Sequence, residues 1–129
     1  MTATRTWHNL RMYGLHVGTD VSALRGRTFE QVAVGEHQVQ LHLSNGATIS
    51  IEGDFSMAPA GGGPTMYSRP ADAAQALADR LGFDVLSAEV LDPGVLTLEF
   101  SDRSQLRAYD SSDRYESYQI RIGDLLIVV

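Results

Sequence analysis

The sequence predicts an α+β fold of mostly antiparallel strands with one main helix over about residues 69–81. Three observations support this prediction. Apolar residues alternate with polar ones in many short stretches, which is the period of strands that bury one face. Two of these stretches share one pattern of apolar positions. A segment between them has the spacing and the end signals of an amphipathic helix.

The shared pattern predicts two pseudo-repeated three-stranded meanders, residues 24–53 and 81–109, within a single domain over 1–129. Further strands follow at the C-terminus. The matched residues, at an offset of 57, are Leu24 with Leu81, Leu41 with Leu98, Leu43 with Phe100, Ile49 with Leu106 and Ile51 with Ala108. We expect an approximate twofold relation between the meanders, in a sheet or partly closed barrel of about seven strands.

The turn of the first meander follows from the strand register. A three-residue loop over 44–46 pairs Leu41 with Ile49, whereas a two-residue loop would oppose apolar and polar residues. The longer loop also places Gly46 in the left-handed position of a bulge. Arg103 occupies that position in the second copy. A left-handed arginine costs about 1 kcal/mol or more, so we expect this loop to take another form.

The second meander begins with a strand whose core-facing residues are predicted to be Leu86, Ala88 and Val90. Asp92-Pro93-Gly94-Val95 then fits a type II turn, with proline second and glycine third. Before this meander, the glycine- and proline-rich residues 57–68 are typical of a flexible surface loop. The helix follows, with Pro70 in its first turn and Gly82 at its end.

The two ends of the chain carry weaker patterns. Residues 10–17 are a candidate strand, and residues 20–25 a candidate helical turn. Tyr118 and Ile120 lie on one face of an alternating segment over 115–122. Residues 125–129 are all apolar, which is typical of a strand covered on both faces or held within a sheet.

Composition limits the class of function. The chain has 16 acidic and 10 basic residues, all of the latter arginine, and a net charge of −6. This charge argues against nucleic acid and leaves a basic protein as a partner. The absence of lysine is typical of a GC-rich bacterial genome. No membrane-spanning run, signal peptide or cysteine occurs, so we expect a cytoplasmic protein.

No motif for a cofactor is present. The four histidines lack a metal-ligand spacing, and the glycine run lacks the lysine of a phosphate-binding loop. We therefore expect neither a metal nor another cofactor. The outward residues of the first meander form a polar face and a second possible binding surface. They are Gln38, Gln40, His42, Thr48, Ser50 and Glu52.

A polar, aromatic segment over 109–118 is the main candidate binding region. Its candidate residues are Tyr109, Asp110, Arg114, Tyr115, Glu116 and Tyr118. Alternation places Glu116 on the face of Tyr118, where a carboxylate needs a partner or an edge position. A structural role, with this carboxylate held by an arginine or by backbone amides at a sheet edge, is the alternative.

Several stretches together resemble a family of small bacterial domains of unknown function. They are Leu24-x-Gly26-Arg-Thr, Val39-Gln-Leu41-His-Leu43, Asn45-Gly46-Ala-x-Ile-x-Ile51-Glu-Gly53 and Tyr115-Glu116-Ser117-Tyr118-Gln-Ile120. The resemblance spans residues 24–129, and the Tyr-Glu-Ser-Tyr segment is its most distinctive part. It implies a bacterial, stand-alone, non-secreted domain and assigns no catalytic or binding residue.

Three functions stay open at this point. The first is a non-enzymatic protein-interaction module, immunity-like or scaffolding, with a basic partner. The second is a small-ligand-binding domain that uses the 109–118 region and a pocket under the glycine-rich loop. The third is a small enzyme. A homodimer is also plausible, because open meanders leave edge strands that need cover.

Overall fold

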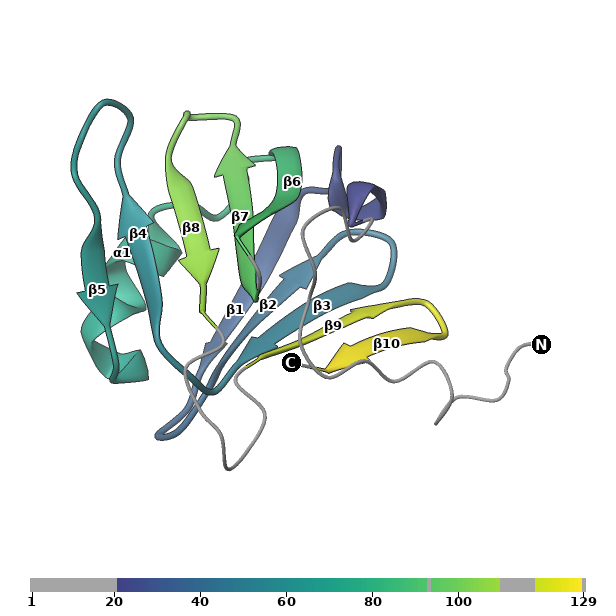
Figure 1. Cartoon of the computed structure of the whole chain (residues 1–129), viewed down its shortest axis with the longest axis horizontal. Helices are drawn as coiled ribbons and strands as arrows, with labels where there is room; N and C mark the ends of the chain where they lie inside the picture. Colours follow the sequence, from purple (N-terminus) through teal and green to yellow (C-terminus); the bar gives the residue numbers. More distant parts are fainter. Residues whose placement is uncertain (1–20, 93, 110–117, 129) are drawn as a thin grey trace.

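The computed structural model describes residues 21–92, 94–109 and 118–128. Ten strands form two five-stranded antiparallel sheets, which confirms the α+β class with more strands than expected. The strands are β1 (Phe29–Val34), β2 (Val39–Leu43), β3 (Ala47–Ile51), β4 (Phe55–Ala58), β5 (Thr65–Tyr67), β6 (Val85–Asp92), β7 (Val95–Phe100), β8 (Gln105–Ala108), β9 (Tyr118–Ile122) and β10 (Leu125–Val128). The first sheet has the order β1-β2-β3-β9-β10 and the second β5-β4-β8-β7-β6 (Figure 1).

Each sheet combines a meander with a hairpin from the other half of the chain. Strands β1, β2 and β3 are neighbours in the first sheet, but the β4–β5 hairpin that follows them pairs with β8. Strands β6, β7 and β8 form the second meander, and the β9–β10 hairpin returns to pair with β3. A duplication would produce two sheets that each contain one meander and one exchanged hairpin. The duplication itself stays a prediction.

The two sheets are joined at one corner, where Thr28 and Asp84 form a backbone bridge. The Thr28 N–H donates to Ser44 Oγ at 2.9 Å, and the Asp84 N–H donates to Ser101 Oγ at 3.0 Å. Thr28 Oγ1 also donates to Asp84 Oδ1 at 2.7 Å. Equivalent serines, one at the end of each meander's second strand, therefore hold Thr28 and Asp84 in place, and the contact between Thr28 and Asp84 joins the two halves.

The register predicted for the first meander is confirmed. Leu41 lies opposite Ile49, and Gly46 has a φ of +82°. The expectation for the second copy was wrong, since Arg103 adopts the left-handed conformation with a φ of +70°. The side chain of Arg103 is largely exposed, and its Nη1 lies 3.6 Å from the carboxylate of Glu99. Gly94, with a φ of +80°, fits the third position of the predicted type II turn.

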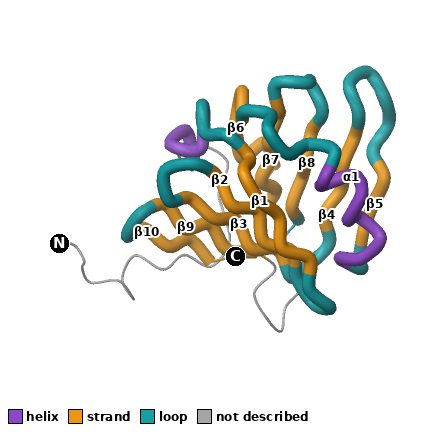
Figure 2. Tube along the Cα trace, turned by 180° about the vertical axis from the view of Figure 1, so that it is seen from behind, coloured by secondary structure: helices purple, strands orange, loops and turns teal. Residues whose placement is uncertain are grey.

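The predicted helix over 69–81 is shorter in the structure. It consists of a 3-10 turn η3 (Pro70–Ala73) and one α-helical turn α1 (Ala74–Ala78), which lie next to β5 and β1 (Figure 2). Tight turns follow instead of helix, and Gly82 donates its N–H to the Phe29 carbonyl at 2.8 Å.

The match of Leu24 with Leu81 fails for the same reason. Leu24, in the 3-10 turn η2 (Ser22–Leu24), is fully buried, whereas Leu81 is 40% exposed. Leu77 is the buried leucine of the helical segment. Because the chain leaves the helix after residue 78, Leu81 no longer lies on the helix face that contacts the core.

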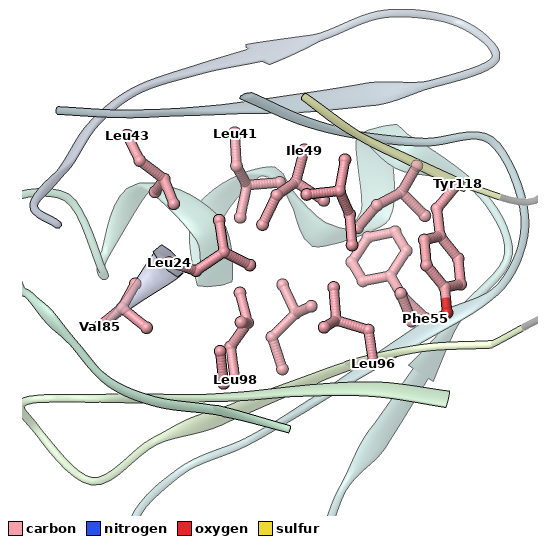
Figure 3. Packing of buried hydrophobic residues seen from close by; sticks show 14 of the residues in the cluster. Leu24, Leu41, Leu43, Ile49, Phe55, Val85, Leu96, Leu98 and Tyr118 are labelled. Atoms are coloured by element: carbon pink, nitrogen blue, oxygen red, sulfur yellow. The ribbon is translucent and has the colours of Figure 1, made fainter. Parts of the chain in front are cut away.

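The core lies between the two sheets. Leu41, Leu43 and Ile49 point from the first sheet toward Leu96 and Leu98 of the second (Figure 3). The twenty-four buried hydrophobic residues form one cluster, so the described strands share one core.

Two sequence expectations about strand faces were wrong. Leu86 is 38% exposed because the register of β6 shifts between Val85 and Ser87, and Val85 takes the inward position. Strand β10 is an edge strand, which pairs with β9 among the described residues, and Leu125 is 37% exposed. Among the described helices, none is long and apolar enough to cross a membrane.

Asp102 in the β7–β8 turn is predicted to make stability depend on pH. Its carboxylate accepts hydrogen bonds from the N–H and the hydroxyl of Ser104 and lies 3.4 Å from Arg80 Nε, although this contact lacks hydrogen-bond geometry. Burial by itself raises the pKa of Asp102, but the bonds from Ser104 and the charge of Arg80 outweigh it and lower that pKa.

A lowered pKa means that the carboxylate stabilises the fold above its unfolded pKa, about 3.9, and that this contribution is lost as the pH falls through the folded pKa. We expect Asp102→Asn to lower the free energy of unfolding at pH 7 by about 1 kcal/mol. Urea unfolding at a series of pH values measures this. A difference from the wild type that stays constant down to pH 2 would contradict the assignment.

Candidate functional site

A pocket of about 170 Å³ lies on the outer face of the second sheet. Strands β4 and β8 form its floor, and the loop between β4 and β5 forms part of its wall. Its lining residues are Ser56, Ala58, Gly62, Pro64, Gln105, Arg107 and Tyr109. Ser56 lies opposite Arg107 in the strand register, and Ala58 lies opposite Gln105. Because alternate residues of the two strands are buried in the core, these four side chains share the outer face.

Arg107 is the most unusual residue of this pocket. It is partly buried, yet its guanidinium has neither an ion pair nor a hydrogen bond with any residue that the structure describes. The other partly buried arginines are engaged. Arg27 donates to three backbone carbonyls at 2.7–2.8 Å, and Arg80 lies beside Asp102. Arg107 is therefore a partly buried arginine whose charge has no counter-charge in the described part of the chain.

The carboxylates nearest in register do not neutralise it. Glu99 lies on the neighbouring strand opposite Gln105, and its carboxylate pairs with Arg103. Thr97 lies directly opposite Arg107 and buries a hydroxyl that has no hydrogen-bond partner among the described residues. This row of the sheet thus carries two polar groups whose bonding capacity is unmet within the described residues.

Neutral donors surround the guanidinium. The hydroxyls of Ser56 and Tyr109 are 3.0 Å apart, and this bond fixes the tyrosine over β4. The side-chain amide of Gln105 lies at the other end of the pocket. A guanidinium presents two parallel N–H groups, which match the oxygens of a carboxylate or phosphate, and neighbouring hydroxyls and amides can donate to the same oxygens.

The glycine run beside the pocket has a defined turn, although the sequence suggested a flexible loop. Gly62 donates its N–H to the Pro59 carbonyl at 3.0 Å, and Gly61 has a φ of +69°. A Cβ at Gly62 would lie 2.6 Å from Pro59 Cγ, whereas one at Gly63 would meet nothing within 4 Å. The turn therefore requires glycine at 61 and 62 but not at 63.

This difference gives a matched pair of variants. We expect Gly62→Ala to push the loop away from the rigid Pro59 ring, to cost about 1–3 kcal/mol of stability and to distort the pocket wall. Gly63→Ala should change neither the stability of the domain nor the wall of the pocket. Thermal unfolding of the two variants, measured side by side, tests this expectation. Equal melting temperatures for Gly62→Ala and the wild type would contradict it.

The structure describes two of the six residues that the sequence proposed as a site, and these two have different surroundings. Tyr109 lines the pocket. Tyr118 instead lies in the core, fully buried, and its hydroxyl donates to the Gly94 carbonyl at 2.9 Å. The other four candidates, Asp110, Arg114, Tyr115 and Glu116, lie outside the described residues. Sequence reasoning missed Arg107, although its place between inward-facing Leu106 and Ala108 marks it as an outward residue.

Two further hollows are polar. Gln40, His42, Thr48 and Ser50, predicted to face outward, line a hollow of about 240 Å³ on the first sheet together with Gln119 and Arg121. Glu52 lies instead in a hollow of about 700 Å³ with Glu36, His37 and Arg69, which has both signs of charge. Within the described ranges, no group of three or more potential ligands is placed to hold a metal ion.

Comparison with known protein families matches residues 20–129 to DUF6188, a family of unknown function. The chain belongs to this family. The match begins four residues before the stretch in which the sequence resembled such a family and ends at the same residue. No curated protein and no solved structure matches this DUF6188 chain. Its function must therefore be argued from the site itself.

Proposed function

We propose that this domain is a non-enzymatic binding module that recognises an anionic group in the Arg107 pocket. The observation that carries the proposal is a partly buried arginine, Arg107, whose guanidinium has no counter-charge in the described chain. Arginine keeps its charge in proteins, and a partly desolvated charge is unfavourable until a partner compensates it. A ligand carboxylate or phosphate supplies that partner.

The other residues of the pocket support binding of an anion. None of the seven described residues that line it is acidic, although the whole chain has a net charge of −6. The hydroxyls of Ser56 and Tyr109 share one proton in the bond between them, so one hydroxyl proton is left to donate to a ligand oxygen, and the amide of Gln105 can donate as well. Among the described residues that line the pocket, neither a histidine nor a carboxylate stands beside Ser56 to act as its base, and this described lining is suited to binding.

The basic protein partner expected from the overall charge stays a prediction. The hollow of about 700 Å³ contains Glu36 and Glu52, but it also contains Arg69 and His37. A surface with both signs of charge does not favour a basic partner over an acidic one. The proposal therefore rests on the pocket of Arg107. Of the functions considered from the sequence, it is closer to a small-ligand-binding domain than to a protein-interaction module.

Isothermal titration with sodium acetate, sodium succinate and sodium phosphate, at one ionic strength kept constant with sodium chloride, tests the proposal. We expect saturable binding of at least one of these anions with a 1:1 stoichiometry. The absence of any saturable heat with all three, at anion concentrations up to about 50 mM, corresponding to a Kd weaker than 10 mM, would contradict it.

A further inference from the structure

We infer that the ligand of the Arg107 pocket is an amphipathic carboxylate, whose charged end binds Arg107 and whose apolar body covers Met66. This inference rests on the proposed function and adds a class of ligand to it. It comes from the side chains beside the pocket rather than from those inside it.

Met66 is the most exposed large hydrophobic residue of the described chain, with 57% of its surface accessible. It lies on β5, opposite Ser56, and Ser56 lies opposite Arg107 on the other side of β4. The three residues thus form one row across the outer face of the sheet. Isolated exposed methionines are ordinary, but this one lies in line with a cation that has no partner within the described ranges.

The surface between the two ends is suited to an apolar chain. Ser56 is only 2% exposed, and Tyr109, which bonds to its hydroxyl, extends over this strand. Pro64 and Ala58 line the same side of the pocket, next to β5. An apolar body leaving the pocket in this direction would contact the proline, the alanine and then the methionine.

The length of the row sets the size of the ligand. Neighbouring strands are about 4.8 Å apart, so Arg107 on β8 and Met66 on β5 are separated by two spacings, about 10 Å. An extended chain of about eight carbons covers that distance. A short anion such as acetate fills only the pocket, and a much longer chain extends past the edge strand into water.

A series of sodium alkanoates tests this inference: acetate, butyrate, hexanoate, octanoate and decanoate, each below its micelle concentration. We expect the Kd to fall about two- to fourfold with each added methylene up to octanoate, and then to level off. Met66→Ser should remove most of this chain-length dependence and keep acetate binding. The matched control is Leu91→Ser, since Leu91 is 45% exposed on β6 of the same sheet and lies outside the pocket.

Two peptide arms distinguish the source of the carboxylate. A hexapeptide ending in two leucines with a free C-terminus presents the same chemistry as octanoate. Tighter binding of this peptide than of octanoate assigns the site to a peptide terminus, and weaker binding assigns it to a small acid. The amidated peptide should not bind in either case, and equal binding of the two peptides overturns the inference.

The results separate the inference from the proposed function. Saturable acetate binding with no gain along the series overturns the amphipathic ligand and leaves the anion site in place. A gain that persists in Met66→Ser and is lost in Leu91→Ser overturns the placement of the apolar body. If no member of the series binds to the wild type, both the inference and a carboxylate ligand are wrong.

Discussion

Replacing Tyr118 by alanine should lower the free energy of unfolding by about 3–5 kcal/mol, the usual cost of removing a buried aromatic ring. Tyr118 is fully buried at the start of β9, where it lies opposite Ile51 of the first sheet. Its ring is next to that of Phe55 from the second sheet (Figure 3), and its hydroxyl donates to the Gly94 carbonyl. The variant therefore loses contacts to both sheets and leaves a buried carbonyl without this donor.

Tyr118→Phe is the matched control, because it removes the hydroxyl and keeps the ring. We expect it to cost about 1 kcal/mol, the net value of one hydrogen bond. Urea unfolding measures both variants. If Tyr118→Ala costs no more than Tyr118→Phe, the ring does not pack in the core and its original assignment to a binding surface has to be reconsidered.

Replacing Arg107 by methionine should weaken anion binding at least tenfold, since hydrogen bonds to a charged group contribute about 1.5–3 kcal/mol. The fold should not be weakened, because no described residue depends on the guanidinium. Methionine keeps most of the apolar stem of arginine, so its packing is preserved. Arg107→Lys should bind with intermediate affinity, because a lysine retains the charge and loses the two parallel donors.

Arg121→Met is the control for charge alone. Arg121 is exposed on the outer face of the first sheet and lines a different hollow. Both variants change the net charge equally, so titrations with acetate and phosphate isolate the effect of position. An equal loss of affinity in both variants would point to a general attraction of anions to the surface.

The sequence predicted local pairing well because alternation and turn chemistry are local. The loop over 44–46 follows from opposing Leu41 and Ile49, and the structure has this register. The sequence could not predict which strands the hairpins pair with, because β4 pairs with β8, a strand far from it in the chain. Nor did alternation reveal the bulge after Val85, which leaves Leu86 exposed while Val85, Ala88 and Val90 are buried.

The site was partly accessible from the sequence. Tyr109 was proposed from its polar surroundings, and a pocket beside the glycine-rich loop was one of the alternatives. Arg107 was missed because what distinguishes it is the lack of a pairing carboxylate among the described residues, and a sequence does not show which charges pair. That property emerges only when β7, β8 and β4 lie side by side and Glu99 is seen to pair with Arg103.

Nuclear magnetic resonance of the arginine Nε–Hε groups, during a titration with sodium acetate, tests the central claim most directly. The anion site predicts a saturable shift of the Arg107 signal, with the signals of Arg121 and Arg27 unchanged apart from the effect of ionic strength. Arg107→Met assigns the signal by its disappearance. A shift of Arg107 that is linear in acetate and no larger than that of exposed Arg121 would contradict a specific anion site in this pocket.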